Sequence, residues 1–346
     1  MADKKSISIP IASQMWALPK RDYPITPRDN LMRALNHEKP VWMPNLYGSS
    51  QLYQSAIARD SPIERDRDAE DWFGVKYKYS AAQASNTPQG NALTEMSKWE
   101  EEVHWEDLSQ YDWAADGKRL QRDESLALYM RMSNGPFERM HMIEGFEQAL
   151  TDIILEPEAV RAFLMRLVDF KIELFNRIRD HVPLDFIVAA DDWGTMRAPF
   201  FSTKTFEQTI LEPTVRFVKA VHDRGTKFIA HCCGKIDPFV PYMVEEIGFD
   251  ALEIQGFNDI HGILEKYGDR VTVECGANPQ LMFDPDATEA QVRGHAREIV
   301  DRYGARAVPG SGAVTNLKSS QEHLYYALEA ELYEYSKERY KVCKST

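Results

Sequence analysis

The chain has 346 residues, of which 43% are hydrophobic and 27% are charged, and its formal net charge at pH 7 is -13. This composition is typical of a globular protein, and the length suits two average domains or one large α/β barrel. The acidic balance argues against nucleic acid or an anionic membrane as a partner, because both bind to basic surfaces.

The cysteine content and the start of the chain bear on the cellular compartment. No apolar run approaches the ~20 residues that cross a bilayer, and Met1 to Ser6 lack the apolar segment of a secretory signal. Four cysteines are too few for a disulfide framework in a chain of this length. We therefore expect a cytoplasmic protein with reduced thiols that are available as metal ligands.

The first part of the chain is irregular. Residues 1–25 show no lasting hydrophobic period and predict an arm that lies over the body of the protein. Thr26 and Pro27 then have the residue types of a helix N-cap and first helical position. Residues 41–46 and 74–79 predict the first two strands, and the rest of the 51–127 region predicts an elaborated crossover.

From residue 127 onward the pattern becomes regular. Apolar runs that begin near 127, 186, 228, 250, 271 and 305 predict strands, with helical stretches between them, including 157–181, 203–223, 237–247 and 287–303. With the starts at 41 and 74, this makes eight βα units, which describe a closed (β/α)8 TIM barrel over residues 26–346 as a single catalytic domain. An open doubly wound sheet would usually show a glycine-rich phosphate turn after its first strand, and residues 47–50 do not form one.

Polar side chains gather at the predicted carboxyl ends of these strands. In a parallel barrel all of these ends open onto one face, and that face carries the chemistry. The polar residues at the ends are Asn45, Tyr47, Asn134, Asp191, Asp192, His231, Cys233, Glu253, Glu274, Cys275 and Ser311.

Two of these residues have the character of metal ligands. His231 and Cys233 are two positions apart at a strand end, so their side chains share a face, while Cys232 points the other way. An imidazole beside a thiolate suits zinc. Cys275 ends the seventh strand, and alternate strands of a barrel contribute to the same layer, which predicts a site of His231, Cys233 and Cys275 with an open fourth position. The alternative is that the cysteines are small core residues.

The pair Asp191 and Asp192 follows another predicted strand. A carboxylate at a strand end can orient a ligating histidine, bind metal itself, or act as a general acid or base. The alternative is that these residues cap the next helix. We predict catalytic roles for both.

An ordered set of motifs resembles the uroporphyrinogen decarboxylase superfamily, over about residues 26 to 335. The motifs are Thr26-Pro27-Arg28-Asp29-Asn30-Leu31-Met32-Arg33-Ala34-Leu35 followed by Pro44, Gly135-Pro136-Phe137 with Gly145-Phe146-Glu147, Asp191-Asp192-Trp193-Gly194-Thr195, His231-Cys232-Cys233-Gly234, and Pro309-Gly310-Ser311-Gly312. The superfamily has a TIM-barrel fold, which agrees with the strand count.

Two branches of this superfamily are relevant to the function. True decarboxylases carry an Arg-Gln-Ala-Gly-Arg segment after the first strand, whereas residues 45–51 here contain no arginine. An acidic protein without these arginines is a poor host for an eight-carboxylate tetrapyrrole. Through His231-x-Cys233 the chain resembles the zinc-dependent, corrinoid-linked methyltransferases. Members that make methyl-coenzyme M have a third zinc ligand, a cysteine, where this chain has Ser311, and Cys275 is the nearest replacement.

A shifted third ligand is what the resemblance implies for the O-demethylase methyltransferases. These enzymes take a methyl group from a methyl ether, often a methoxylated aromatic, and give it to a separate corrinoid (cobalamin) protein. Zinc would act as a Lewis acid on the ether oxygen, and Asp191 or Asp192 would orient the metal site or protonate the leaving oxygen. The residues expected to hold the substrate are Asn45, Tyr47, Trp193, Glu253 and Ser311.

Other functions remain open at this point. They are methyl transfer from methylcorrinoid to a thiol or tetrahydrofolate, a metal-free lyase of the decarboxylase kind, and a non-enzymatic binding barrel. The sequence does not establish the oligomeric state, and a homodimer is one expectation.

Overall fold

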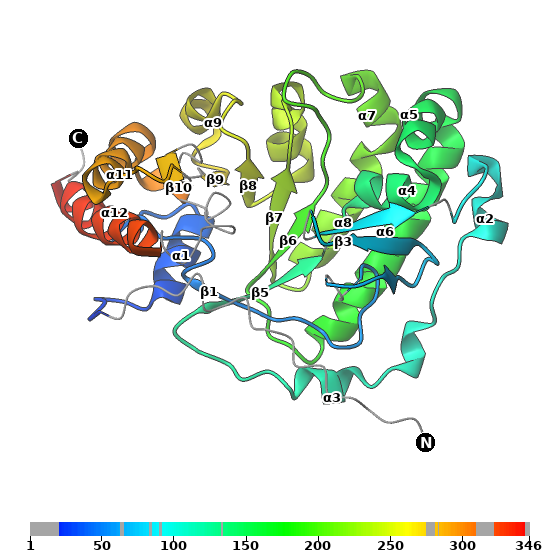
Figure 1. Cartoon of the computed structure of the whole chain (residues 1–346), viewed down its shortest axis with the longest axis horizontal. Helices are drawn as coiled ribbons and strands as arrows, with labels where there is room; N and C mark the ends of the chain where they lie inside the picture. Colours follow the sequence, from blue (N-terminus) through cyan, green and yellow to red (C-terminus); the bar gives the residue numbers. More distant parts are fainter. Residues whose placement is uncertain are drawn as a thin grey trace.

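The computed structural model describes residues 21–62, 66–82, 85–89, 92–132, 134–274, 281–282, 284–308 and 322–342. Its centre is a parallel sheet of seven strands in the order β1-β5-β6-β7-β8-β9-β10, so that each strand pairs with the next strand of this sheet along the chain (Figure 1). The strands are β1 (Ser50–Leu52), β5 (Ala127–Met132), β6 (Phe186–Ala190), β7 (Lys227–Cys232), β8 (Ala251–Ile254), β9 (Thr272–Glu274) and β10 (Ala307–Val308). Sequential parallel strands with helices between them are the arrangement of a TIM barrel, and the predicted fold class is confirmed.

Helices cover the outside of the strands. They are α1 (Pro27–Leu35), α2 (Trp99–Glu102), α3 (Trp113–Gly117), α4 (Pro136–Glu144), α5 (Phe146–Leu155), α6 (Pro157–Arg179), α7 (Thr203–Thr209), α8 (Leu211–His222), α9 (Ile260–Tyr267), α11 (Glu289–Tyr303) and α12 (Glu322–Val342). In Figure 1, α12 lies beside α11 near the C-terminal end of the chain. Among the described residues, no helix has both the length and the hydropathy of a membrane span.

Two predicted helices differ from the structure, and prolines explain both differences. The helix expected over 203–223 is divided into α7 and α8 around Ile210, because Pro213 in the first turn of α8 has no N–H to continue the ladder. The helix expected over 237–247 is a 3-10 turn, η4 (Asp237–Phe239), and a π-helix, η5 (Tyr242–Ile247). Pro238 and Pro241 remove two of the backbone donors that an α-helix would use there.

The strand predicted at 41–46 is wrong, and β1 takes its place a few residues later. Side chains occupy the backbone groups that a ladder would need. Asn30 donates to the carbonyl of Trp42 at 2.9 Å and accepts from the Val41 N–H at 2.7 Å, while the Met43 N–H donates to Ser336 Oγ at 2.8 Å. Pro44 has no N–H, which further disfavours an internal strand.

The strand predicted at 74–79 exists but does not belong to the barrel. It is β3 (Lys76–Ser80), which pairs antiparallel with β2 (Ala69–Glu70) and β4 (Ser85–Gln89) in a separate small sheet. Lys76 and Lys78 are exposed while Tyr77 between them is buried. One buried and one solvated face is typical of an antiparallel sheet, whereas the barrel strands are buried on both faces.

The interior of the barrel has its own hydrophobic cluster. Strand residues of this cluster alternate with residues that face the outer helices, and α1 covers one end, where Thr272 Oγ1 donates to the carbonyl of Ala34 at 2.6 Å. The cluster consists of Leu31, Ala34, Leu35, Leu46, Tyr47, Ala127, Tyr129, Phe186, Val188, Ile229 and Ala251.

Part of the predicted N-terminal arm falls within the described residues. Tyr23 stacks on Trp42 with ring centroids 5.2 Å apart, and the Arg21 guanidinium lies 4.4 Å from the centroid of the Tyr333 ring. Residues 1–20 lie outside the described part, so the division into an arm and a single barrel domain stays a prediction.

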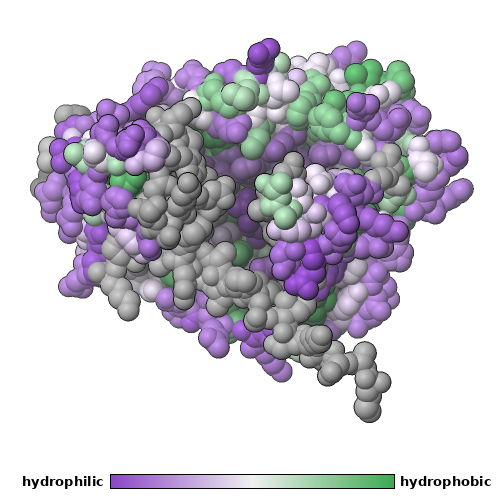
Figure 2. Space-filling view, in the orientation of Figure 1, coloured by the Kyte–Doolittle hydropathy of each residue, from purple (hydrophilic) through white to green (hydrophobic). Residues whose placement is uncertain are grey.

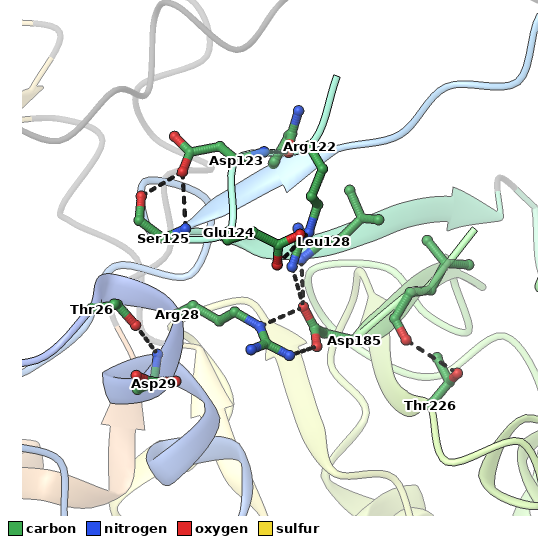
Figure 3. A network of polar contacts seen from close by, with 12 residues as sticks. Thr26, Arg28, Asp29, Arg122, Asp123, Glu124, Ser125, Leu128, Asp185 and Thr226 are labelled. Carbon is green, nitrogen blue, oxygen red and sulfur yellow. Dashed lines mark hydrogen bonds and ion pairs between the residues drawn. The ribbon is translucent and has the colours of Figure 1, made fainter. Parts of the chain in front are cut away.

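A polar network ties α1 to the barrel at the start of β5 and β6 (Figure 3). Asp185 accepts hydrogen bonds from Arg28 Nε at 3.1 Å and Nη2 at 2.7 Å, from Arg122 Nη2 at 3.2 Å and from the Leu128 N–H at 2.8 Å. Burial alone would raise the pKa of Asp185, but Arg28 and the Leu128 N–H bring it below its ordinary value. The carboxylate therefore stabilises the fold in its charged form.

Asp185→Asn is expected to lower the free energy of unfolding by about 2 kcal/mol at pH 7, because the hydrogen bonds it weakens involve charged groups. Since the folded pKa is depressed, this contribution is complete above the unfolded pKa of about 3.9 and is lost as pH falls through the folded value. Urea unfolding at several pH values measures it. Asp269→Asn, at an exposed position, is the matched control, and an equal loss in both variants would contradict the prediction.

Candidate metal centre

The end of β7 carries the site. This strand lies between β6 and β8, with His231 in register with Ala190 on one side and Glu253 on the other. Beyond the strand, Gly234 has a φ of +103°, and a Cβ there would lie 2.3 Å from the carbonyl carbon of Gly194. Only glycine fits this turn without displacing backbone, so the sequence His-Cys-Cys-Gly ends the strand tightly against the loop after β6.

Three side chains converge at this end. One donor atom each from Asp192, His231 and Cys233 lies within 4.8 Å of the others. Cys233 Sγ is 3.4 Å from His231 Nε2, which is 3.9 Å from Asp192 Oδ1. The same aspartate oxygen accepts a hydrogen bond from the Cys233 N–H at 2.7 Å, which fixes it beside the thiol. Nitrogen, sulfur and oxygen donors in one place suit a zinc ion.

The opposite side of the His231 ring faces a carboxylate. His231 Nδ1 lies 3.1 Å from Glu253 Oε2, and the same oxygen accepts a hydrogen bond from the Tyr47 hydroxyl at 2.7 Å. Burial alone would lower the pKa of His231, but Cys233 and Glu253 raise it to about 10. Positive charge is therefore stabilised between these groups. A carboxylate behind a ligating histidine also fixes the ring orientation and increases its basicity.

Glu138, in the first turn of α4, also belongs to the site, and the sequence reasoning missed it. Its Oε2 is buried and has no hydrogen-bond partner among the described residues. Burial and the nearby Asp192 carboxylate raise the pKa of Glu138. A buried carboxylate oxygen without a donor fits a pocket that holds a cation. In the sequence, a glutamate just after Gly-Pro-Phe is indistinguishable from an ordinary residue of a helix start.

The two neighbouring aspartates have different surroundings. The Asp191 carboxylate is buried and accepts from the Glu138 N–H at 2.7 Å, the Phe137 N–H at 3.4 Å and Trp193 Nε1 at 2.8 Å. Burial raises the pKa of Asp191 to about 7. A Cβ at Gly135 would lie 2.3 Å from the Asp191 Cβ, so the glycine permits this close approach. Asp191 thus caps α4, while Asp192 faces the histidine and the thiol.

The structure brings some of the predicted substrate residues to the site and not others. Glu253 lies beside His231, and Tyr47 reaches the site through its hydrogen bond to Glu253. Asn45 instead accepts from the Gly48 N–H at 2.7 Å and donates to Glu329 at 2.7 Å, which stabilises the turn before β1. The Trp193 indole is 1% exposed and packs on Phe206 at 4.9 Å between centroids, so it supports the site from behind. Cys275 and Ser311 lie outside the described residues.

Arg131 is a second residue that the sequence reasoning missed. Its Nη1 donates to the Tyr47 hydroxyl at 3.1 Å. Desolvation by the surrounding strands would lower the pKa of this guanidinium, but Tyr47 and Glu253 raise it above its ordinary value. The available signal was a single charge inside the apolar strand Ala-Leu-Tyr-Met-Arg-Met. A chain of three polar contacts thus connects Arg131 with Tyr47, Glu253 and His231.

Comparison with known proteins places this site in a family. The chain is similar to the uroporphyrinogen decarboxylase of Methylococcus capsulatus, with 24% identity over 195 residues that cover 51% of this chain and 49% of the relative. It therefore spans about half the length of that curated relative. Its fold is similar to that of a methyltransferase from Methanosarcina mazei, with a TM-score of 0.65 and 15% identity, covering 89% of this chain and 98% of the other. Because the model of the family described as Uroporphyrinogen decarboxylase (URO-D) matches residues 93–329, well over half of the sequence, the chain belongs to the uroporphyrinogen decarboxylase family.

Proposed function

We propose that this protein is a zinc-dependent methyltransferase that takes a methyl group from a methyl ether, in particular a methoxylated aromatic, and gives it to the cobalt of a corrinoid protein. The observation that carries the proposal is the convergence of Asp192, His231 and Cys233 at the end of β7, with Glu253 behind the histidine. The likeness to a solved methyltransferase supports this choice within the family through the fold alone.

The residues of the site have complementary roles in this proposal. His231, Cys233 and Asp192 would hold zinc, with Cys275 as a further candidate ligand. When bound, zinc would supply a Lewis acid that makes an ether oxygen a better leaving group. Glu253 Oε2 lies 3.1 Å from His231 Nδ1 and accepts a hydrogen bond from the Tyr47 hydroxyl at 2.7 Å. With the carboxylate at Nδ1, the ring directs Nε2 toward Cys233 and Asp192.

Proton supply is the second requirement. Transfer of the methyl group breaks its bond to oxygen and forms a carbon–cobalt bond, and the remaining alkoxide or phenolate must take up a proton. Asp192 is partly exposed beside the histidine and the thiol, so it is the better placed of the two predicted catalytic aspartates. Asp191 contributes by fixing the first turn of α4, which carries Glu138.

A protein partner agrees with the surface around the site. Phe146 at the start of α5 packs on Phe200 in the loop after β6, with 5.1 Å between centroids. Hydrophobic side chains near this rim are exposed, with 42% for Phe146, 67% for Ile154, 72% for Leu155 and 75% for Met196. Figure 2 shows hydrophobic groups along the upper right edge, over the region of α5 and α7. Such a patch suits the docking of the protein that presents the corrinoid.

A decarboxylase is the second candidate, favoured by the curated relative that bears this name. Activity on uroporphyrinogen with no requirement for zinc would support it. Against it, the segment 45–51 supplies no arginine for the substrate carboxylates.

The test of the proposed function uses the zinc-loaded protein, reduced cobalamin and a panel of methoxylated aromatics. Formation of methylcobalamin, followed by its absorbance and lost after zinc removal, is the expected result. Cobalamin that stays unmethylated with every ether, or methylation that is unchanged without zinc, would contradict the proposal.

Glu253→Gln is expected to weaken zinc binding by about 10- to 100-fold, the usual effect of removing the partner of a ligating histidine. The amide keeps the shape but not the negative charge next to His231 Nδ1. Competition with a chelating dye measures the affinity. Glu246→Gln, an exposed change on η5, is the matched control, and equal zinc affinity in the two variants would contradict the assigned role.

A further inference from the structure

The side chain of Arg131 faces the mouth of the barrel. Arg131 lies one residue before the end of β5, on the same face of the strand as Tyr129, whose ring stacks on Phe186 inside the barrel with 5.1 Å between centroids. The other five residues of this strand are buried, whereas the Arg131 side chain is exposed. An arginine that points into the barrel and still contacts solvent must face the open end.

The guanidinium is only partly used by the protein. Nη1 donates to the Tyr47 hydroxyl, and Cζ lies 5.8 Å from the centroid of the Tyr47 ring. Within the described part of the chain, Arg131 forms no ion pair, and its Nε and Nη2 have no hydrogen-bond acceptor. The nearby Glu253 carboxylate already accepts from Tyr47 and contacts His231.

The unused atoms form a carboxylate-binding edge. Nε and Nη2 lie along one side of the planar guanidinium, and two parallel N–H groups match the two oxygens of a carboxylate. Arg28 uses this same edge on Asp185, with 3.1 Å from Nε and 2.7 Å from Nη2. No carboxylate of the described residues binds this edge of Arg131. A bound ligand could supply the carboxylate instead.

We propose that Arg131 anchors a carboxylate of the methyl donor, so that the substrates are methoxylated aromatic acids. This inference rests on the proposed function and narrows its substrate class. Arg131 contacts Tyr47, Tyr47 contacts Glu253, and Glu253 contacts His231, at 3.1, 2.7 and 3.1 Å in turn. The anchor and the candidate metal ligands are thus connected by three successive contacts inside the barrel. A ring held by its carboxylate at one end can present its methoxy group at the other.

The first experiment measures binding by calorimetry to the zinc-loaded protein. The probes are 3- and 4-methoxybenzoate, the corresponding methoxybenzamides as neutral analogues, and benzoate. We expect the wild type to bind at least one acid about tenfold or more tightly than its amide, the effect of one charge-assisted bidentate contact. Arg131→Met should remove this preference and leave amide binding unchanged. Arg302→Met, an exposed change on α11, should leave both affinities as they are.

Arg131→Lys keeps the positive charge but loses the two parallel N–H donors, so it should retain only part of the preference for the acid over the amide. It also tests the inference if the methionine variant fails to fold. Equal binding of acid and amide by the wild type, or a preference that survives in the variants, would overturn the inference. Arg131-dependent binding of benzoate without any methyl transfer would leave the anchor in place and overturn the proposed function. Methyl transfer from neutral ethers alone would support the proposed function and overturn the carboxylate anchor.

Discussion

Cys233→Ala is expected to abolish stoichiometric zinc binding and, with it, methyl transfer. Its thiolate is the only sulfur donor of the three-residue cluster that the described residues form. The neighbouring Cys232 cannot replace it, because its side chain is 1% exposed and points to the opposite face of the strand. Burial and the nearby aspartates also raise the pKa of Cys232 far above its ordinary value, so it stays a neutral thiol, which is a poor zinc ligand.

The adjacent cysteine provides the matched control. Elemental analysis and a chelator competition should show about one zinc per chain in the wild type and in Cys232→Ala. The zinc affinity of Cys233→Ala should fall by more than about 100-fold. Removing a residue that only supports a ligand costs less than this. His231→Ala should behave like Cys233→Ala. Zinc retained at full affinity in Cys233→Ala would remove the metal site from the end of β7 and the methyl-transfer proposal with it.

The same measurement on Cys275→Ser and Asp192→Asn separates the two candidates for the third ligand. Zinc lost in Cys275→Ser alone supports the set predicted from the strand order. Zinc lost in Asp192→Asn alone supports the cluster that converges in the structure. The sequence could not make this choice, because a carboxylate in the loop after one strand and a thiol after another are equally compatible with the barrel.

The barrel itself was largely predictable from the sequence. Strands such as β6 and β7 are short apolar runs bounded by turn residues, and their local pattern agrees with their burial on both faces. The failure at 41–46 has a tertiary cause, because Asn30 and Ser336 capture backbone groups of this segment. Ser336 lies near the other end of the chain, and no local pattern records such a contact.

The convergence of His231 and Cys233 could be predicted for a simple geometric reason, since the pleat of a strand places residues two apart on one face. The same reasoning could not assign roles to Asp191 and Asp192, which follow one strand directly. Their difference arises from α4, whose first N–H groups capture Asp191 and leave Asp192 to the histidine. Arg131 and Glu138 were missed because their roles depend on residues that other strands and helices place beside them, and the local sequence does not show these neighbours.

A buried ion pair behind the site gives the second large expected effect. Arg139, on α4 next to Glu138, is 0% exposed, and its Nη1 donates to Asp71 at 2.6 Å and to Tyr77 at 3.1 Å. Its Nη2 donates to Asn134 at 2.6 Å and to the carbonyl of Asp60. This one side chain therefore joins the small antiparallel sheet and the early crossover to α4, the helix beside the candidate metal centre.

Arg139→Met is expected to lower the free energy of unfolding by about 3 to 5 kcal/mol at pH 8, because it leaves the Asp71 carboxylate buried without its cation. Burial already raises the pKa of Asp71, and Arg139 opposes that rise. Without the arginine the pKa rises further, so the carboxyl takes up a proton as pH falls and the loss should be smaller at pH 5 than at pH 8. Urea unfolding at the two pH values measures both effects.

The double variant Arg139→Met/Asp71→Asn tests the cause of this loss. The amide that replaces the Asp71 carboxylate would be neutral and could still accept from the Phe73 and Val75 N–H groups, which Asp71 now binds at 3.0 and 3.1 Å. If the unpaired charge is the cause, the double variant should be more stable than Arg139→Met alone at pH 8, and the two should approach each other at pH 5. A double variant that is no more stable than Arg139→Met at pH 8 would instead mean that the packing of the long arginine side chain, rather than its charge, holds α4 against the crossover.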